Sequence, residues 1–344
     1  MNEQPLSERT TTKPLWRRWV VAAIKFAFLA LVLAFVAQTF RDGLRDLYQQ
    51  KLTFSWSHLV AACVAYALAQ LTMGVFWRRV LAAIGRPTKL TEALSTYYIS
   101  QPGKYVPGKA SVILIRATRL HSAAMRSGEH ADYKTSLVAA GASSFYETLC
   151  FMSVGAILAA GLIPLVDGTD ELRWLTPASL ALALICLAPA APPAFRWLLG
   201  RFTASSGRAE LRDRLRQSLG YDLAAYGVLS ALGAWCLLSV FLWLTAEAIG
   251  MAGGRGVADL PFWTLAATLP TAAGFVSLLP AGIGVREAVS LAVLAPVLGD
   301  GGAVAVTAAS RLLGVATEVA VCASLLVGEF LRQRRRNAPT RETP

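Results

Sequence analysis

Repeated long apolar runs, separated by short basic loops, constrain this chain more than any other feature. Six stretches are each long enough to cross the hydrocarbon core of a bilayer, which takes about 20 apolar residues in a helix. They are 19–39, 58–77, 135–160, 174–199, 223–249 and 303–330. Charged residues make up only 16% of the chain, whereas a soluble protein carries about 25%. The sequence therefore predicts an all-α polytopic membrane protein with six full spans, the first of them an uncleaved anchor.

The distribution of lysine and arginine predicts how these spans are oriented. Twenty-five basic residues lie in 1–19, 78–134, 196–222 and 331–344, and five lie in the loops at the opposite span ends. Cytoplasmic loops carry the excess of Lys and Arg in membrane proteins. We therefore expect a multi-pass protein of the cell membrane with both termini in the cytoplasm. Its transmembrane domain is expected at 19–331, between cytoplasmic tails at 1–18 and 332–344.

Two further segments, 91–120 and 261–298, are apolar in part but interrupted by glycine and proline. With six full spans, the charge pattern requires 91–120 to begin and end inside and 261–298 to begin and end outside. Each segment is then a re-entrant hairpin, and the two enter from opposite faces. The halves 19–160 and 174–331 become an inverted-topology repeat, which is an architecture of transporters.

The alternative topology has eight spans, with 261–279 and 285–298 crossing the membrane separately. The second of these has 14 residues. At about 1.5 Å per residue it falls short of a hydrocarbon core of about 30 Å. This shortfall favours the hairpin.

The first hairpin contains the motif GKYVPGKAS at 103–111, followed by Arg116. Glycines let backbone N–H groups approach a phosphate, and a helix that begins after the motif presents its positive end to the same anion. Lys104, Lys109 and Arg116 are therefore predicted to receive the phosphate of a lipid headgroup. The same motif supplies Tyr105, Gly108 and Ser111 as further candidates. The alternative is that the two lysines extend to the membrane interface without a ligand.

The second hairpin contains PAGIGVRE at 280–287, in which Gly282 and Gly284 precede Arg286 and Glu287. Ions at membrane depth cost about 2.5–3.5 kcal/mol each or more to insert, so they are candidates for function. The alternative is an ion cluster that only holds the hairpin in place.

Charged residues within the long spans complete the candidate site. Arg311 and Glu318 stand seven residues apart, too far for a direct pair on one helix. Arg311 therefore needs a partner elsewhere, and Glu147 or Glu287 is the expected counter-charge. Glu147 and Glu318 are predicted to balance the charge of the site.

Several other functions lack the residues that they need. The 3 histidines and 5 cysteines show no metal-binding spacing, and no serine–histidine, paired-carboxylate or D-x-D arrangement stands near the hinges. The sequence predicts no catalytic residue, metal or cofactor. Although the net charge is +12, no nucleic-acid-binding module can be placed on the chain. The basic segment 207–219 is either an amphipathic helix on the inner leaflet or a solvated connector.

Three motifs carry a resemblance to a known family: GKYVPGKAS with Arg116, PAGIGVRE, and Arg311-Leu312-Leu313. The chain resembles the lysylphosphatidylglycerol synthase transmembrane-region family, also described as flippase-like, over nearly all of 15–335. Two departures stand out. The family usually has an arginine directly after the glutamate that corresponds to Glu147, and this chain has Thr148 there. Ala281 stands where the family has a glycine.

The resemblance implies a module that translocates lipids or lipid-linked precursors. Relatives flip aminoacylated phosphatidylglycerol or accompany polyprenyl-phosphate glycosylation, and aminoacyl transfer belongs to a separate soluble domain that has no counterpart in these 344 residues. We therefore expect a flippase-like transporter of an anionic phospholipid or a polyprenyl-phosphate-linked precursor. The alternatives are a non-catalytic scaffold and a membrane subunit of a lipid-modifying glycosyl- or aminoacyl-transferase. The expected partners are membrane lipid and either a second copy of the chain or a lipid-modifying enzyme, with no nucleic acid.

Overall fold

The computed structural model describes residues 54–105, 111–128, 132–204 and 220–336, and within these ranges the regular structure is entirely helical. Four helices of the described part are long and apolar enough to cross a membrane. They are α2 (Trp56–Ala83), α5 (Tyr133–Leu162), α9 (Tyr221–Ala248) and α11 (Val285–Arg336). This confirms a helical membrane protein, and it confirms the predicted helices at 58–77, 135–160 and 223–249. The predicted span 19–39 and the segment 207–219 lie outside the described residues.

The predicted span at 174–199 is not one continuous helix. It consists of α6 (Leu175–Ala190) and α7 (Pro192–Ala204), which are bent by 68° at the break between them. Ala191 has ψ 133°, the extended conformation that a following proline imposes on the residue before it. The proline pair at 192–193 therefore ends α6, and the two helices together make a fifth candidate span.

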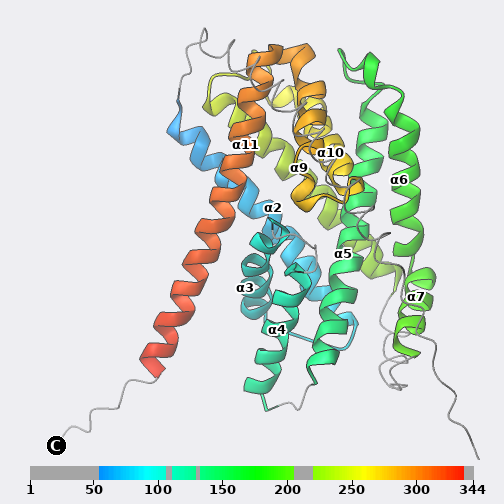
Figure 1. The fold of residues 1–344 in the computed structure, drawn as a ribbon, viewed down its shortest axis with the longest axis vertical. Helices are drawn as coiled ribbons and strands as arrows, with labels where there is room; N and C mark the ends of the chain where they lie inside the picture. The colour runs from blue at the N-terminus through cyan, green and yellow to red at the C-terminus, as the bar shows by residue number, and fades with distance from the viewer. Residues whose placement is uncertain (1–53, 106–110, 129–131, 205–219, 337–344) are drawn as a thin grey trace, which may run out of the picture.

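The predicted span at 303–330 belongs to a longer helix. α11 runs from Val285 to Arg336 but is interrupted at Gly299, whose φ of 71° and ψ of 165° are not helical. The chain turns at this glycine, so the part of α11 before it and the part after it run in different directions (Figure 1).

Both glycine- and proline-rich segments form two helices joined by a hinge. The first comprises α3 (Leu90–Ser100), the 3₁₀ turn η1 (Gln101–Tyr105) and α4 (Ser111–Arg126). The second comprises α10 (Leu260–Val276), the 3₁₀ turn η4 (Pro280–Gly282) and the start of α11. In Figure 1, α3 and α4 lie in the lower half of the molecule, whereas α10 and the start of α11 lie in the upper half. The turns η1 and η4 contact each other, so the two hinges meet inside the molecule.

The second hinge depends on backbone conformations that suit glycine. Gly282 has φ 69°, and a Cβ atom placed on it would lie 2.7 Å from the Cα atom of Gly274 on α10. Real Cβ atoms do not approach other atoms so closely. Glycine at these two positions therefore lets η4 pack directly on α10.

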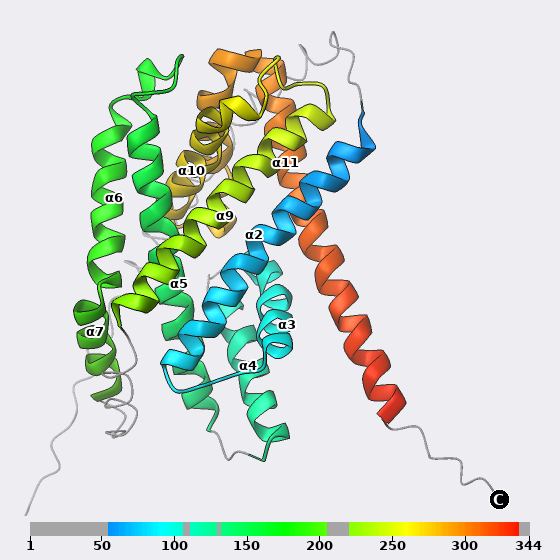
Figure 2. The same cartoon turned by 180° about the vertical axis from the view of Figure 1, so that it is seen from behind.

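Small residues also bring the long helices together. Figure 2 shows α2 and α9 running side by side across the molecule. A Cβ atom on Gly227 of α9 would lie 2.6 Å from the ring of Phe76 on α2. α9 also packs on α5, where Trp235 stacks on Phe151 with ring centroids 4.3 Å apart. Close packing through small residues is the usual way in which helices associate in a membrane, and here it forms the wall behind the two hinges.

Candidate functional site

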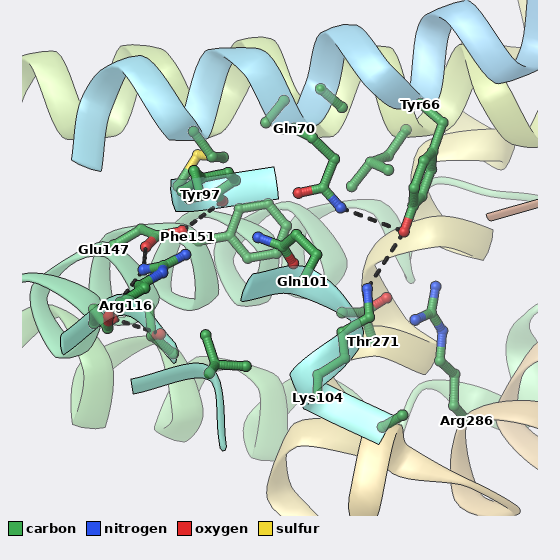
Figure 3. Close-up of a pocket in the computed structure, with 18 of the residues that line it drawn as sticks. Tyr66, Gln70, Tyr97, Gln101, Lys104, Arg116, Glu147, Phe151, Thr271 and Arg286 are labelled. Carbon is green, nitrogen blue, oxygen red and sulfur yellow. Dashed lines mark hydrogen bonds and ion pairs between the residues drawn. The ribbon is translucent and has the colours of Figure 1, made fainter. Parts of the chain in front are cut away.

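A cavity of about 320 Å³ lies where the two hinges meet the long helices (Figure 3). Its walls come from α2, α3, η1, α4, α5, α9, α10, η4 and α11. The polar side chains on these walls are Tyr66, Gln70, Tyr97, Gln101, Lys104, Arg116, Ser144, Glu147, Thr148, Thr271, Arg286 and Arg311. Five of the residues singled out from the sequence, namely Lys104, Arg116, Glu147, Arg286 and Arg311, therefore share one cavity.

Arg116 on α4 and Glu147 on α5 form a buried ion pair on one wall of this cavity. Their side chains are joined by a 2.7 Å contact, and the two residues are 2% and 9% exposed. Arg116 also donates to the hydroxyls of Ser100 and Ser144. Tyr97 donates to the second carboxylate oxygen of Glu147. Both oxygens of Glu147 are thereby occupied.

Two aromatic rings complete the surroundings of Arg116. Its guanidinium carbon lies 4.5 Å from the ring centroid of Tyr97 and 4.7 Å from that of Trp77. A cation over aromatic faces is attracted to them, the more so where water is excluded. In this structure the charge of Arg116 is neutralised by Glu147, and the pair joins α4 to α5. Phosphate binding by Arg116 stays a prediction.

Lys104 on η1 has its own carboxylate partner, Glu318 on α11. Tyr66 on α2 donates to the same oxygen of Glu318 over 2.5 Å, and Gln70 donates to it over 3.3 Å. Glu318 is 3% exposed. Since residues from α2, η1 and α11 share this cluster, it fixes the first hinge to the last helix.

Arg311 and Glu287 form the third ion pair. The Nε atom of Arg311 lies 2.5 Å from one carboxylate oxygen of Glu287, and its NH2 group donates to the carbonyl of Ala281. The other oxygen of Glu287 accepts the backbone N–H of Gly284 over 2.6 Å. Glu287 thus caps the helix that begins after the hinge. Of the two partners expected for Arg311, Glu287 is confirmed and Glu147 is wrong, because Glu147 is held by Arg116.

Arg286 differs from the other three cations of the cavity. Its guanidinium points into the cavity in Figure 3. Within the described residues, it makes no ion pair and no side-chain hydrogen bond of its own. Among the residues that the structure describes, four cations line the cavity, and three of them are matched by the carboxylates of Glu147, Glu287 and Glu318. An arginine stays protonated in proteins, so one positive charge faces the cavity unneutralised.

The remaining predicted residues are placed around this centre. Tyr105 lines a smaller adjoining cavity. Gly282 and Gly284 shape the second hinge, with φ of 69° and 86°, and Ser111 begins α4 without being among the residues that line either cavity. Gly108 and Lys109 lie outside the described residues.

Sequence reasoning missed several polar residues of the cavity, among them Tyr66, Tyr97, Gln101 and Thr271. Tyr66 and Thr271 stand in largely apolar stretches, and Tyr97 and Gln101 precede the first motif. All four are uncharged, and an isolated hydroxyl or amide gives little signal. Tyr66 lies four residues before Gln70 and so shares one face of α2 with it, which is a signal that could have marked Tyr66. Thr148, at the position where the resembling family has arginine, lines the cavity and donates to the backbone of its own helix.

The comparison with family models agrees with the motifs. A search of curated proteins found no match to the chain. The model of the family described as "Lysylphosphatidylglycerol synthase TM region" matches residues 22–327. This range covers both hinges, all three ion pairs and Arg286, and it extends over most of the chain. The chain therefore belongs to the lysylphosphatidylglycerol synthase transmembrane-region family.

Proposed function

We propose that this protein is a flippase-like transporter that binds the phosphate-bearing headgroup of a lipid between its two hinges and moves it across the membrane. The observation that carries the proposal is the unneutralised guanidinium of Arg286 in a cavity of about 320 Å³. An unpaired cation away from bulk water is costly unless an anion joins it. A phosphate supplies that anion and accepts the paired N–H groups of an arginine. Membership of a family tied to lipid handling supports the same reading.

The arrangement of the hinged segments supports a re-entrant topology. In Figure 1 the first segment enters from the lower end of the molecule and the second from the upper end. Non-helical backbone at membrane depth is tolerated where it is enclosed by protein or lines a watery cavity, and both turns adjoin the cavity. We propose six full spans, one of them being 19–39, and two re-entrant hairpins related as an inverted repeat.

The orientation follows from the basic residues. α4 and α11 both end at the lower end of Figure 1, and Arg126, Arg332 and Arg334 stand at those ends. We propose that the protein lies in the cell membrane. This end of the molecule and both termini then face the cytoplasm. The first hinge then faces the cytoplasmic leaflet and the second the outer leaflet.

In this mechanism the two hinges offer one cation each to the headgroup. Lys104 comes from the first hinge and Arg286 follows the second, and both line the same cavity. The phosphate is held by Arg286, while Lys104 exchanges between Glu318 and the phosphate. The acyl or polyprenyl chains stay in the lipid, and the hairpins shield the headgroup in turn. The cargo is an anionic phospholipid, of which the aminoacyl-phosphatidylglycerol type is one case, or a polyprenyl-phosphate-linked precursor.

The test is transport in vesicles that contain the purified full chain. Lipids with a fluorescent acyl chain are placed in the bilayer, and a membrane-impermeant quencher reports which leaflet they occupy. We expect the wild type to move anionic lipids, Arg286→Ala to lose this activity, and Arg126→Ala to keep it. Arg126 is a suitable control because it forms an exposed pair with Glu92 at the end of α4. A wild-type protein that binds anionic lipid but moves none would refute transport and favour the scaffold or enzyme-subunit alternative.

A further inference from the structure

A second, smaller cavity adjoins the first at Arg286. It has a volume of about 50 Å³ and shares Tyr66, Lys104, Thr271, Arg286 and Arg311 with the larger cavity. A cavity needs about 10–15 Å³ of such volume to hold one water. The smaller cavity therefore has room for a group of a few non-hydrogen atoms. A phosphate bound at Arg286 would therefore have one polar cavity on either side.

Hydroxyl groups line the smaller cavity. They belong to Tyr105 at the first hinge and to Ser290, Thr307 and Ser310 on α11. Thr307 is only 3% exposed, and its hydroxyl oxygen has no hydrogen-bond partner within the described residues. A buried hydroxyl without a partner is unfavourable, and a ligand hydroxyl would satisfy it. The walls thus suit a headgroup that carries its own hydroxyls.

The charges of the smaller cavity disfavour an ammonium group. Lys104, Arg286 and Arg311 line it, together with the single carboxylate of Glu287. Both oxygens of that carboxylate are occupied, by Arg311 and by the backbone of Gly284. The carboxylate of Glu147 on the larger cavity is likewise occupied at both oxygens. Glu318 is not among the residues that line either cavity. The carboxylates of Glu147 and Glu287 are each paired with an arginine, whereas Arg286 is unneutralised among the described residues. A cationic headgroup would therefore meet a net positive charge, and like-charge contacts cost several kcal/mol.

We propose that the smaller cavity is a specificity subsite that accepts an uncharged, hydroxyl-bearing group attached to the lipid phosphate and rejects an ammonium group. This inference rests on the proposed function, because it presumes a phosphate at Arg286. Among the lipid classes of the proposed cargo, it favours polyol or sugar phospholipids and phosphate-linked glycolipids over lipids whose headgroup ends in an amine, such as the aminoacylated type.

The test compares lipids that share acyl chains and a phosphate but differ beyond it. The purified full chain is exposed to equal amounts of phosphatidylglycerol and phosphatidylethanolamine, and the retained lipid is measured by native mass spectrometry. Both are phosphodiesters, but one ends in hydroxyls and the other in an ammonium. We expect phosphatidylglycerol to be retained about tenfold more, which corresponds to about 1.4 kcal/mol.

Variants separate the subsite from the phosphate site. Thr307→Val keeps the shape of the side chain and removes the hydroxyl. We expect it to lower the preference for phosphatidylglycerol over phosphatidic acid by about three- to tenfold, the size of one hydrogen bond. Arg286→Gln should weaken the retention of all three lipids. Ser324→Ala on the same helix serves as the control, because the Ser324 hydroxyl donates only to the backbone of α11.

The outcomes are distinguishable. Equal retention of phosphatidylethanolamine and phosphatidylglycerol, or an unchanged preference in Thr307→Val, would overturn the subsite and leave the proposed function standing. If the wild type retained none of the three lipids, the phosphate site itself would be refuted.

Discussion

Lys104 and Arg286 face the same cavity from two different hinges, but only Lys104 has a carboxylate partner in the part of the chain that the structure describes. Glu318 neutralises Lys104, whereas Arg286 keeps a full charge directed at the cavity. A closed ion cluster lacks this asymmetry, because all of its charges are paired. If all four cations were paired, the cluster would serve only to hold the hairpins in place. The single unmatched charge is the basis on which we propose an anionic ligand for the cavity.

The buried pair of Arg116 and Glu147 is expected to stabilise the fold. Arg116→Ala leaves the carboxylate of Glu147 buried without its counter-charge, which costs about 3–5 kcal/mol. The midpoint of thermal unfolding in detergent should fall clearly. The double variant Arg116→Met, Glu147→Leu replaces both ions by apolar groups and should recover most of the loss.

The matched control for this pair is Arg126→Ala. Arg126 and Glu92 form an ion pair whose side chains are 62% and 40% exposed, and such surface pairs contribute about 0–1 kcal/mol. An unfolding midpoint that falls equally in Arg116→Ala and Arg126→Ala would contradict the structural role given to Arg116.

Removing the charge of Glu318 should strengthen anion binding. Glu318→Gln frees Lys104, so the cavity gains a second unneutralised positive charge beside Arg286. We expect anionic lipid to bind several-fold more tightly and the binding to become more sensitive to salt. A titration of the purified protein with a fluorescent anionic lipid measures both.

The comparison for Glu318→Gln is Glu329→Gln. Glu329 also pairs with an arginine, Arg119, but neither residue is among those that line the cavity. Glu329→Gln should leave the lipid affinity unchanged. The account of Lys104 fails if Glu318→Gln and Glu329→Gln bind lipid alike.

Ala281 at the second hinge occupies a conformation better suited to glycine. Its φ is 50° and its ψ is 15°, the left-handed region that costs a residue with a Cβ atom about 1 kcal/mol. Ala281→Gly is therefore expected to raise the unfolding midpoint by a few degrees, even though most substitutions destabilise. Thermal unfolding followed by circular dichroism measures the change.

The neighbouring Gly282→Ala should have the opposite effect. It combines a φ of 69° with a steric conflict against Gly274, so the hinge cannot pack on α10 as it does. We expect a lower unfolding midpoint and reduced lipid transport. A stabilised Gly282→Ala would show that the second hinge has a different backbone conformation.

The apolar runs were sufficient to predict where the long helices lie, because burial in a membrane leaves a continuous signal in the sequence. The ends of α2, α5 and α9 lie within a few residues of the predicted bounds 58–77, 135–160 and 223–249. The break at Ala191 was missed although the sequence contains its cause, the proline that follows. A helix break within an apolar run cannot be recognised from hydropathy, because hydropathy carries no information on backbone conformation.

The partners within the candidate site were less predictable. The motifs identified Lys104, Arg116, Arg286 and Arg311 as a set, because charges in apolar surroundings stand out. Their pairing depends on contacts between distant segments, such as that of Lys104 with Glu318, 214 residues away. No spacing rule within one helix determines such a contact. The unneutralised charge of Arg286 therefore became visible only once the three ion pairs were known.

The most direct test of the central claim is the affinity of the purified protein for an anionic lipid before and after substitution of Arg286. Titration of the wild type, Arg286→Lys, Arg286→Ala and Arg126→Ala with a fluorescent phosphatidylglycerol gives four dissociation constants. The loss of a charged hydrogen bond of about 1.5–3 kcal/mol predicts binding roughly 10- to 100-fold weaker in Arg286→Ala. The dissociation constant of Arg286→Lys should lie between those of the wild type and Arg286→Ala, and that of Arg126→Ala should match the wild type. A folded Arg286→Ala protein that binds the lipid as tightly as the wild type would contradict the claim that Arg286 holds the phosphate.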